Sequence, residues 1–183
     1  MTIAALLLAA GASRRFGEAD KLAAPFDGLP LVVHAARALT GAGILRRLAV
    51  VRSGRIARLL ENEGFATLMI APGLQSDSIR AGVAHLGQPD ARLLIALGDM
   101  PLVQAEDYRR LIATPPDRPA CAWKDGMPMP PAIFPPGWRP RLMTLQGDRG
   151  AGALLRELPR PAQLHVPAER LADFDHPSDF AGH

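Results

Sequence analysis

The chain has 183 residues, enough for one domain with a full hydrophobic core, and its 48% hydrophobic and 21% charged residues are typical of a soluble globular protein. The net charge is only +3 and like charges form no run of five or six, which argues against a nucleic-acid-binding surface and favours a small anionic ligand. The single cysteine, Cys121, excludes an internal disulfide and favours the reducing cytoplasm, and no apolar stretch reaches the roughly 18 residues of a membrane span.

Strand and helix patterns alternate along the chain up to residue 113. Four short apolar runs have the character of strands buried on both faces: residues 3–8, 48–52, 66–70 and 92–97. Helical spacing, closed in most cases by a glycine, predicts the helices between and after them: residues 31–43, 54–64, 76–87 and 104–113. This alternation predicts an α/β fold in which a mostly parallel sheet has helices on both faces.

Residues 114–140 have a different composition, since they contain half of the 18 prolines. So many prolines exclude a helix, but the short apolar pieces 120–123 and 132–134 are compatible with edge strands. We expect this segment to be an insertion or lid over the sheet of a single domain that spans residues 1–183. A further helix is predicted over residues 148–158.

The loop after the first strand, "AAGASRRFGEADK", carries an unusual set of residues. Gly11 and Gly17 allow the backbone to approach a ligand closely, and arginines beside them add donors for phosphate oxygens. Lys21 is one of two lysines in a chain with 19 arginines, and its compact charge on a flexible stem can follow charge that moves between phosphate oxygens. The alternative is an ordinary solvated turn.

Acidic residues follow the fourth strand and return near the end of the chain. Asp99 comes directly after a buried strand, at the sheet edge where ligands of parallel α/β sheets bind. Mg²⁺ is commonly held by one or two carboxylates together with substrate phosphates, although an Asp here can also cap a turn. In "DFDHPSDF", Asp175 is a candidate second metal ligand, whereas Asp179 is expected to have a structural role at a helix start.

These motifs, in this order, resemble the MobA-like nucleotidyltransferase family, and within it the molybdenum cofactor cytidylyltransferases. The segments that carry the resemblance are "LAAGASRRFGEADKL", "SIRAGV", "GDMPLV", "LQGDRGAGALLR" and "DFDHPSDF". The resemblance implies a Rossmann-like, three-layer α/β/α fold of the nucleotide-diphospho-sugar transferase type. It also implies which residues bind the nucleotide: Leu8, Ala9, Ala10, Gly11, Ala12, Ser13, Arg15, Gly17, Lys21, Ser78 and Arg80.

The implied reaction is the Mg²⁺-dependent transfer of a nucleoside monophosphate from a nucleoside triphosphate to a phosphorylated acceptor such as molybdopterin, with release of pyrophosphate. Lys21, Arg15 and Asp99 would be the catalytic residues, with Asp99 and Asp175 as metal ligands. Relatives with Ala-Ala-Gly in the first loop use cytidine nucleotides, so residues 9–11 favour CTP. A molybdoenzyme or a chaperone would then receive the product.

The sequence departs from the family pattern at two places. Met129 and Pro130 stand where the acceptor region usually has Gly and a polar residue, and Asp77 replaces a small residue beside the nucleotide site. Two alternatives therefore stay open. One is guanylyl transfer, or nucleotidyl transfer to another phosphorylated small molecule, and the other is a non-catalytic protein that binds a nucleotide or cofactor.

Overall fold

A seven-stranded sheet forms the centre of the computed structural model, which describes residues 2–11, 20–87, 90–147 and 150–180. In spatial order the strands are β5 (Ala66–Met69), β4 (Arg46–Val51), β1 (Ile3–Ala9), β6 (Arg92–Leu97), β8 (Met127–Phe134), β7 (Ala120–Lys124) and β9 (Gln163–His165). The first four are mutually parallel, β8 is antiparallel to both of its neighbours, and β9 is parallel to β7. All strands except β8 therefore point the same way, which confirms the predicted, mostly parallel α/β sheet.

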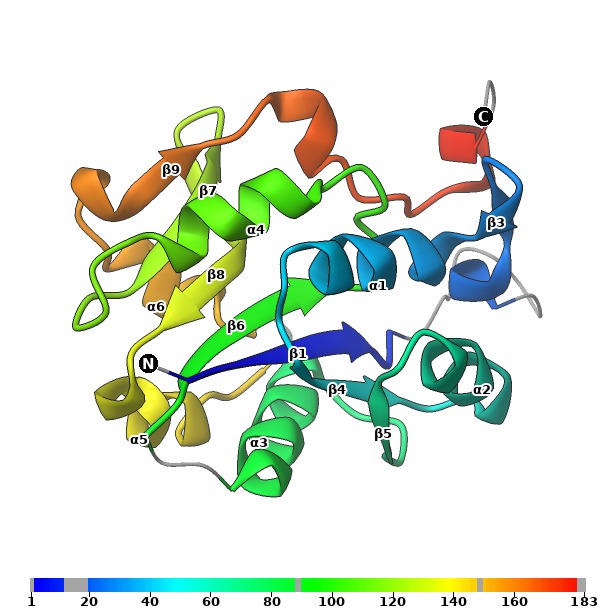
Figure 1. Ribbon diagram of the computed structural model, residues 1–183, viewed down its shortest axis with the longest axis horizontal. Helices are drawn as coiled ribbons and strands as arrows, with labels where there is room; N and C mark the ends of the chain where they lie inside the picture. The colour runs from blue at the N-terminus through cyan, green and yellow to red at the C-terminus, as the bar shows by residue number, and fades with distance from the viewer. Residues whose placement is uncertain (1, 12–19, 88–89, 148–149, 181–183) are drawn as a thin grey trace.

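Helices cover both faces of this sheet (Figure 1). One face carries α1 (Leu31–Gly41), α2 (Gly54–Asn62) and α4 (Ala105–Ile112). The opposite face carries α3 (Gln75–Leu86), α5 (Arg139–Met143) and α6 (Gly152–Arg156). The structure is thus the three-layer α/β/α arrangement that the sequence predicts.

The continuous apolar run of β1 follows from its central place in the sheet. Ala5, Leu7 and Ala9 pack into the hydrophobic cluster beneath α1. Ala4, Leu6 and Leu8, which alternate with them, pack into the cluster beneath α3. Because successive side chains of a strand point to opposite faces, a strand covered on both sides has no position for a polar residue.

Short elements complete the chain. Two-residue strands form a small hairpin, β2 (Pro25–Phe26) with β3 (Leu29–Pro30). The 3₁₀ turns are η2 (Lys21–Ala23), η3 (Pro136–Trp138), η4 (Arg160–Ala162), η5 (Ala168–Leu171) and η6 (Pro177–Phe180). The last of them lies beside the small hairpin (Figure 1), where the Phe180 and Phe26 rings are 6.3 Å apart. The end of the described chain therefore returns to the segment that follows the first loop.

The proline-rich segment differs from the expectation. Residues 120–134 form β7 and β8, which continue the main sheet instead of lying over it, and neither is an edge strand because β8 lies between β6 and β7 and β7 lies between β8 and β9. The prolines permit this because β8 pairs with β6 only through its proline-free end, Ala132–Phe134. The pairing with β7 shifts register between Cys121 and Ala122, opposite Pro130 and Pro131, whereas Pro128 pairs with Trp123. The assignment of residues 1–183 to one domain stays a prediction.

Two further observations concern the helices and the surface. Within the described part of the predicted helix over residues 148–158, α6 spans only Gly152–Arg156, and residues 148 and 149 lie outside the described residues. None of the helices in the described part of the chain is long and apolar enough to cross a membrane.

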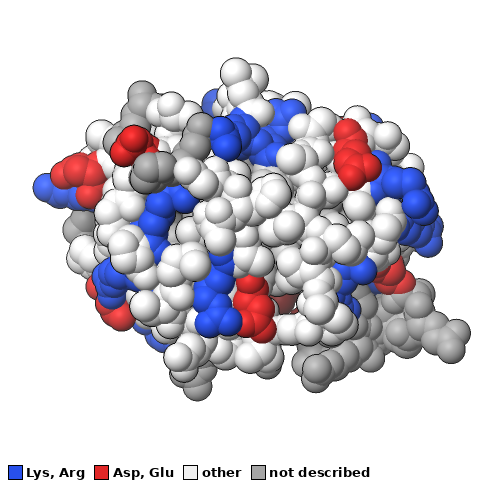
Figure 2. Space-filling view, turned by 90° about the horizontal axis from the view of Figure 1, so that it is seen from below, with Lys and Arg blue, Asp and Glu red and all other residues white. Residues whose placement is uncertain are grey.

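On the face seen in Figure 2, the described Lys and Arg side chains stand in separate groups with uncharged surface between them. Basic charge on this face is therefore spread out.

Candidate active site

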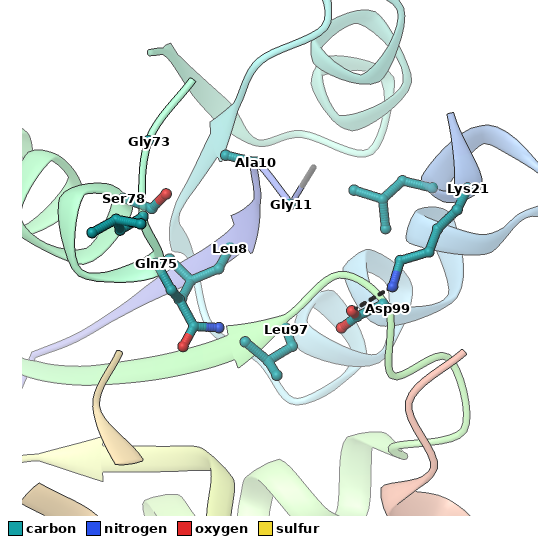
Figure 3. Close-up of a pocket in the computed structure, with 11 residues that line it drawn as sticks. Leu8, Ala10, Gly11, Lys21, Gly73, Gln75, Ser78, Leu97 and Asp99 are labelled. Carbon is teal, nitrogen blue, oxygen red and sulfur yellow. Dashed lines mark hydrogen bonds and ion pairs between the residues drawn. The ribbon is translucent and has the colours of Figure 1, made fainter. Parts of the chain in front are cut away.

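A cavity of about 210 Å³ opens beyond the carboxyl ends of β1 and β6 (Figure 3). Six residues that the sequence singles out line it: Leu8, Ala10, Gly11, Lys21, Ser78 and Asp99. They come from the end of β1, from η2, from α3 and from the turn after β6. The structure thus brings three separate motifs to one edge of the sheet, as expected for a parallel α/β sheet.

Lys21 lies at one end of the cavity between two carboxylates. Its Nζ donates to Asp99 Oδ2 at 2.9 Å and to Asp175 Oδ1 at 2.5 Å, and the residue is only 6% exposed. Burial alone would lower the pKa of the Lys21 ammonium, but the charges of the two carboxylates and the hydrogen bonds to them outweigh it and raise this pKa above 10.5. Lys21 is therefore a permanently charged cation at neutral pH.

The local sequence fixes Lys21 in this place. Asp20 caps the 3₁₀ turn η2, and its Oδ1 accepts a hydrogen bond from Leu22 N at 3.1 Å. Leu22 and Ala23 are buried in the cluster beneath α1, which anchors the turn to the core. The anchored turn therefore holds Lys21 at the cavity, where its ammonium meets the two carboxylates.

Asp175 reaches the site because the end of the chain is attached to the turn after β6. Phe174 N donates to the Asp99 carbonyl at 3.0 Å, and the Phe174 ring packs edge-on against Phe26 with centroids 4.9 Å apart. Asp179 Oδ2 accepts hydrogen bonds from the backbone N–H groups of Asp175 and His176 at 2.8 and 2.7 Å. These hydrogen bonds lower the pKa of the Asp179 carboxyl, and they confirm the structural role expected for this residue.

Asp99 and Asp175 together fit a divalent cation. Both carboxylates already contact one cation, the Lys21 ammonium, so their oxygens converge on a common point. The described residues contain no cluster of three or more His, Cys, Asp or Glu side chains arranged for a metal. Mg²⁺ does not require one, because it is usually held by one or two carboxylates and completes its octahedron with water and substrate phosphate oxygens.

The first turn of α3 forms the opposite wall of the cavity. Ser78 lines it, but Arg80 does not. The Arg80 guanidinium donates instead to the Leu145 carbonyl at 3.2 Å and to Asp77 Oδ1 at 2.5 Å. Asp77 also accepts from Leu74 N at 2.8 Å and so caps α3. The acidic residue that looked misplaced in the sequence is therefore neutralised by Arg80 and used as a helix cap.

Other predicted site residues lie away from the cavity or outside the residues that the structure describes. Ala9 packs into the cluster beneath α1 and does not line the cavity. Met129 pairs with Ala122 and packs against that same cluster, and neither it nor Pro130 lines the cavity. Four predicted nucleotide-binding positions lie outside the described residues: Ala12, Ser13, Arg15 and Gly17.

Sequence reasoning missed several residues that line the cavity: Leu22, Gly73, Leu74, Gln75 and Leu97. Gln75 is the only one of them with a polar side chain, which lines the cavity from the start of α3 (Figure 3). The available clue was its position in the loop after the third strand, which the rule for parallel sheets places at the ligand site. Because the spacing of "PGLQSDS" departs from the family pattern, Gln75 was not recognised as a candidate.

The chain belongs to the MobA-like NTP transferase domain family, whose model matches residues 5–163. It is a nucleotidyltransferase domain by this membership, as the sequence motifs indicate. The match includes most of β1, all of β6 and every residue that lines the cavity, but it ends before Asp175. The C-terminal carboxylate is therefore supported by the geometry of the site and not by the family model.

Two curated proteins share significant identity with part of the chain. The bifunctional protein GlmU of Rhizorhabdus wittichii is 34% identical over 113 residues, which are 60% of this chain and 25% of GlmU. A probable molybdenum cofactor guanylyltransferase of Pyrococcus horikoshii is 31% identical over 110 residues, which are 59% of this chain and 55% of that protein. The chain thus matches about a quarter and about half of these relatives.

Solved structures share the fold over nearly the whole chain. A nucleotidyl transferase from Methanothermobacter superposes with a TM-score of 0.84 at 19% identity, covering 98% of this chain and 94% of that one. A manganese complex of Rv0371C from Mycobacterium tuberculosis superposes with a TM-score of 0.77 at 21% identity, covering 91% of this chain and 89% of the other. At these identities the likeness establishes the three-layer architecture alone.

Proposed function

We propose that this protein transfers a nucleoside monophosphate from a nucleoside triphosphate to a phosphorylated acceptor, with Mg²⁺ as cofactor and pyrophosphate as the second product. The observation that carries the proposal is the convergence of Lys21, Asp99 and Asp175 at the carboxyl edge of the sheet, beside the backbone of Ala10 and Gly11. A cation next to two carboxylates suits a polyphosphate bound together with a divalent ion.

In this reaction an oxygen of the acceptor phosphate attacks the α-phosphorus, and the bond from that phosphorus to the bridging oxygen of the β-phosphate breaks. Lys21 would hold the triphosphate and neutralise charge that moves to the leaving oxygens. Asp99 and Asp175 would hold Mg²⁺, whose charge supports the same neutralisation. No protein base is needed, because the acceptor phosphate is already an anion.

We favour CTP as the donor and molybdopterin, or the molybdenum cofactor, as the acceptor. The support for CTP is the Ala-Ala-Gly sequence of the first loop, of which Ala10 and Gly11 line the cavity. The Pyrococcus horikoshii relative, by its name a probable guanylyltransferase, makes guanylyl transfer the second candidate. We further propose that the reaction takes place in the cytoplasm and that a molybdoenzyme or its chaperone receives the product.

The proposal is tested first by thermal unfolding with CTP, GTP, ATP and UTP, each with and without Mg²⁺. A ligand at about 100 times its Kd stabilises a protein by about 2.7 kcal/mol, so a bound nucleotide produces a clear shift of the melting temperature. We expect a Mg²⁺-dependent shift that is largest with CTP. Pyrophosphate release in the presence of molybdopterin then tests transfer. Stabilisation by a nucleotide without turnover would favour a non-catalytic binding protein, and no stabilisation would overturn the proposal.

A further inference from the structure

We infer that the carboxamide of Gln75 recognises the base of the nucleotide and that Gly150 leaves the space that sets its orientation. This inference rests on the proposed function and adds to it the residue that distinguishes one nucleotide from another. Neither residue was singled out for binding by the sequence, and Gly150 belongs to a motif, "GDRGAG", to which the proposed reaction gives no role.

The two ends of the cavity differ in chemistry (Figure 3). Lys21 and Asp99 form the charged end, whereas Gln75 and Ser78 on α3 form a neutral, polar end. A triphosphate is drawn to the cation and the metal ligands, so the nucleoside must extend toward α3. Leu8 and Leu97 line the cavity between the two ends and offer an apolar surface to a ribose or a flat base.

The Gln75 carboxamide is available for a ligand. None of the hydrogen bonds between described residues at the start of α3 involves this carboxamide, whose Oε1 lies against Gly150, and the residue is half-buried in the cavity wall. A carboxamide has one carbonyl acceptor and an NH₂ donor side by side. It can therefore form two parallel hydrogen bonds with the Watson–Crick edge of a base: with cytosine it accepts from N4–H and donates to N3, and with guanine it donates to O6 and accepts from N1–H.

Gly150 holds this carboxamide in place by lacking a side chain. A Cβ at Gly150 would lie 1.9 Å from Gln75 Oε1 and 2.7 Å from Gln75 Cδ, so any other residue here must displace the Gln75 side chain. Leu145 and Gly147, which precede Gly150 in the sequence, are attached to α3 by hydrogen bonds from Arg80 to the Leu145 carbonyl and from Ser76 N to the Gly147 carbonyl. Gly147 and Gly150 are thus both placed against the start of α3.

The test is calorimetric titration with CTP, GTP and inorganic tripolyphosphate, each in the presence of Mg²⁺. Tripolyphosphate has no base and reports only on the charged end. We expect Gln75→Leu to weaken binding of the preferred nucleotide about tenfold and to leave tripolyphosphate binding unchanged. The matched control is Gln146→Leu, which changes an exposed glutamine of the adjoining loop that does not line the cavity and should bind like the wild type.

Two further variants test orientation and chemistry. Gly150→Ala should reproduce the effect of Gln75→Leu, whereas Gly43→Ala should not, although both glycines have positive φ values (+48° and +82°), because the space around Gly43 is open. Gln75→Glu should lower the ratio of CTP affinity to GTP affinity. A carboxylate accepts from both N1–H and N2–H of guanine but faces the N3 lone pair of cytosine.

The outcomes separate the two claims. If Gln75→Leu leaves nucleotide affinities unchanged, or weakens tripolyphosphate as much as the nucleotides, Gln75 does not recognise the base and the inference alone fails. If the wild-type protein binds neither tripolyphosphate nor any nucleotide, the proposed function fails and this inference fails with it. A loss confined to nucleotides, reproduced by Gly150→Ala and absent from both controls, would support the inference.

Discussion

Lys21 Nζ lies 2.9 Å from Asp99 Oδ2 and joins side chains that are 78 positions apart in the sequence. The same ammonium contacts Asp175, so one cation neutralises both proposed metal ligands. A divalent ion bound by these carboxylates needs the oxygens that Lys21 now occupies. The ammonium and the metal ion therefore compete, and a bound triphosphate, which offers Lys21 other oxygens, would favour the metal.

Replacing Lys21 should consequently strengthen metal binding to the free protein. Lys21→Met removes the ammonium and leaves two carboxylates close together, so we expect Mn²⁺ to bind about tenfold more tightly in the absence of nucleotide. The free Mn²⁺ signal in electron paramagnetic resonance measures this affinity. Lys124→Met, at the other lysine of the chain, is the control and should leave the affinity unaltered. Equal Mn²⁺ affinities in wild type and Lys21→Met would contradict the competition.

Loss of either carboxylate should abolish transfer without unfolding the protein. Asp99→Asn and Asp175→Asn keep the shape of the side chain but remove the charge that holds Mg²⁺, and we expect turnover to fall by at least about a hundredfold. Asp173→Asn changes a neighbouring, exposed aspartate and serves as the control. Pyrophosphate release measures activity and circular dichroism measures folding. Turnover close to wild type in Asp99→Asn would refute the metal assignment.

Asp179 should act through Asp175, because its carboxylate accepts two hydrogen bonds from the backbone of Asp175 and His176. We expect Asp179→Ala to weaken Mn²⁺ binding several-fold while the affinity for tripolyphosphate without metal stays the same. The pKa of the Asp179 carboxyl is lowered in the folded protein, so its stabilising contribution is present above its unfolded pKa of about 3.9 and is lost as the pH falls through the folded value. Asp179→Ala lacks this contribution, so its free energy of unfolding should fall less than that of the wild type as the pH is lowered. Unchanged Mn²⁺ affinity would mean that Asp179 contributes to stability but does not position Asp175 for metal binding.

The glycine of "SIRAGV" should be required for packing. A Cβ at Gly82 would lie 2.4 Å from Leu6 Cδ1, and Leu6 is fully buried in β1 and cannot move away. We expect Gly82→Ala to lower the free energy of unfolding by about 1–3 kcal/mol, measured by urea denaturation. Gly54→Ala at the start of α2, where the nearest neighbour is an arginine tip 3.9 Å away, should be neutral or stabilising by up to about 1 kcal/mol. Similar losses in both variants would exclude the packing explanation.

Cys121 should be unreactive in the folded protein. It is fully buried in β7, and burial raises the pKa of its thiol to about 11. Only about one thiol in a thousand would be ionised at pH 8, and the thiolate is the reactive form. We therefore expect a thiol reagent to modify Cys121 slowly at pH 8 and rapidly after addition of urea, as followed by mass spectrometry. Rapid modification of the folded protein would indicate that β7 opens locally.

The sequence was sufficient to predict those parts of the fold and the site that depend on a local pattern of residues. The run Ile3–Ala9 has to be a strand covered on both faces, and the rule that ligands bind at the carboxyl ends of parallel strands was enough to place Lys21 and Asp99 at one edge. Asp175 was recognised as a candidate, but its contact with Lys21 spans 154 positions and depends on the packing of Phe174 against Phe26. No local pattern contains that information.

The interior position of β8 and the role of Gln75 also escaped the sequence for physical reasons. Proline disfavours interior strands, and only the tertiary arrangement shows that β8 meets β6 through its proline-free end. The space for the Gln75 carboxamide exists because Gly150, which is 75 positions away in the sequence, has no side chain. The sequence around Gln75 does not indicate this neighbour.

The attachment of Phe174 to the Asp99 carbonyl also orders events during synthesis. The four parallel strands can pair once residue 97 has left the ribosome, because all of their partners precede it. Asp175 is made long afterwards, and it takes its place only when Phe174 and Phe180 pack against Phe26. A nascent chain that already has its parallel core would therefore lack one of the two carboxylates, and the ability to hold a metal ion would be acquired last.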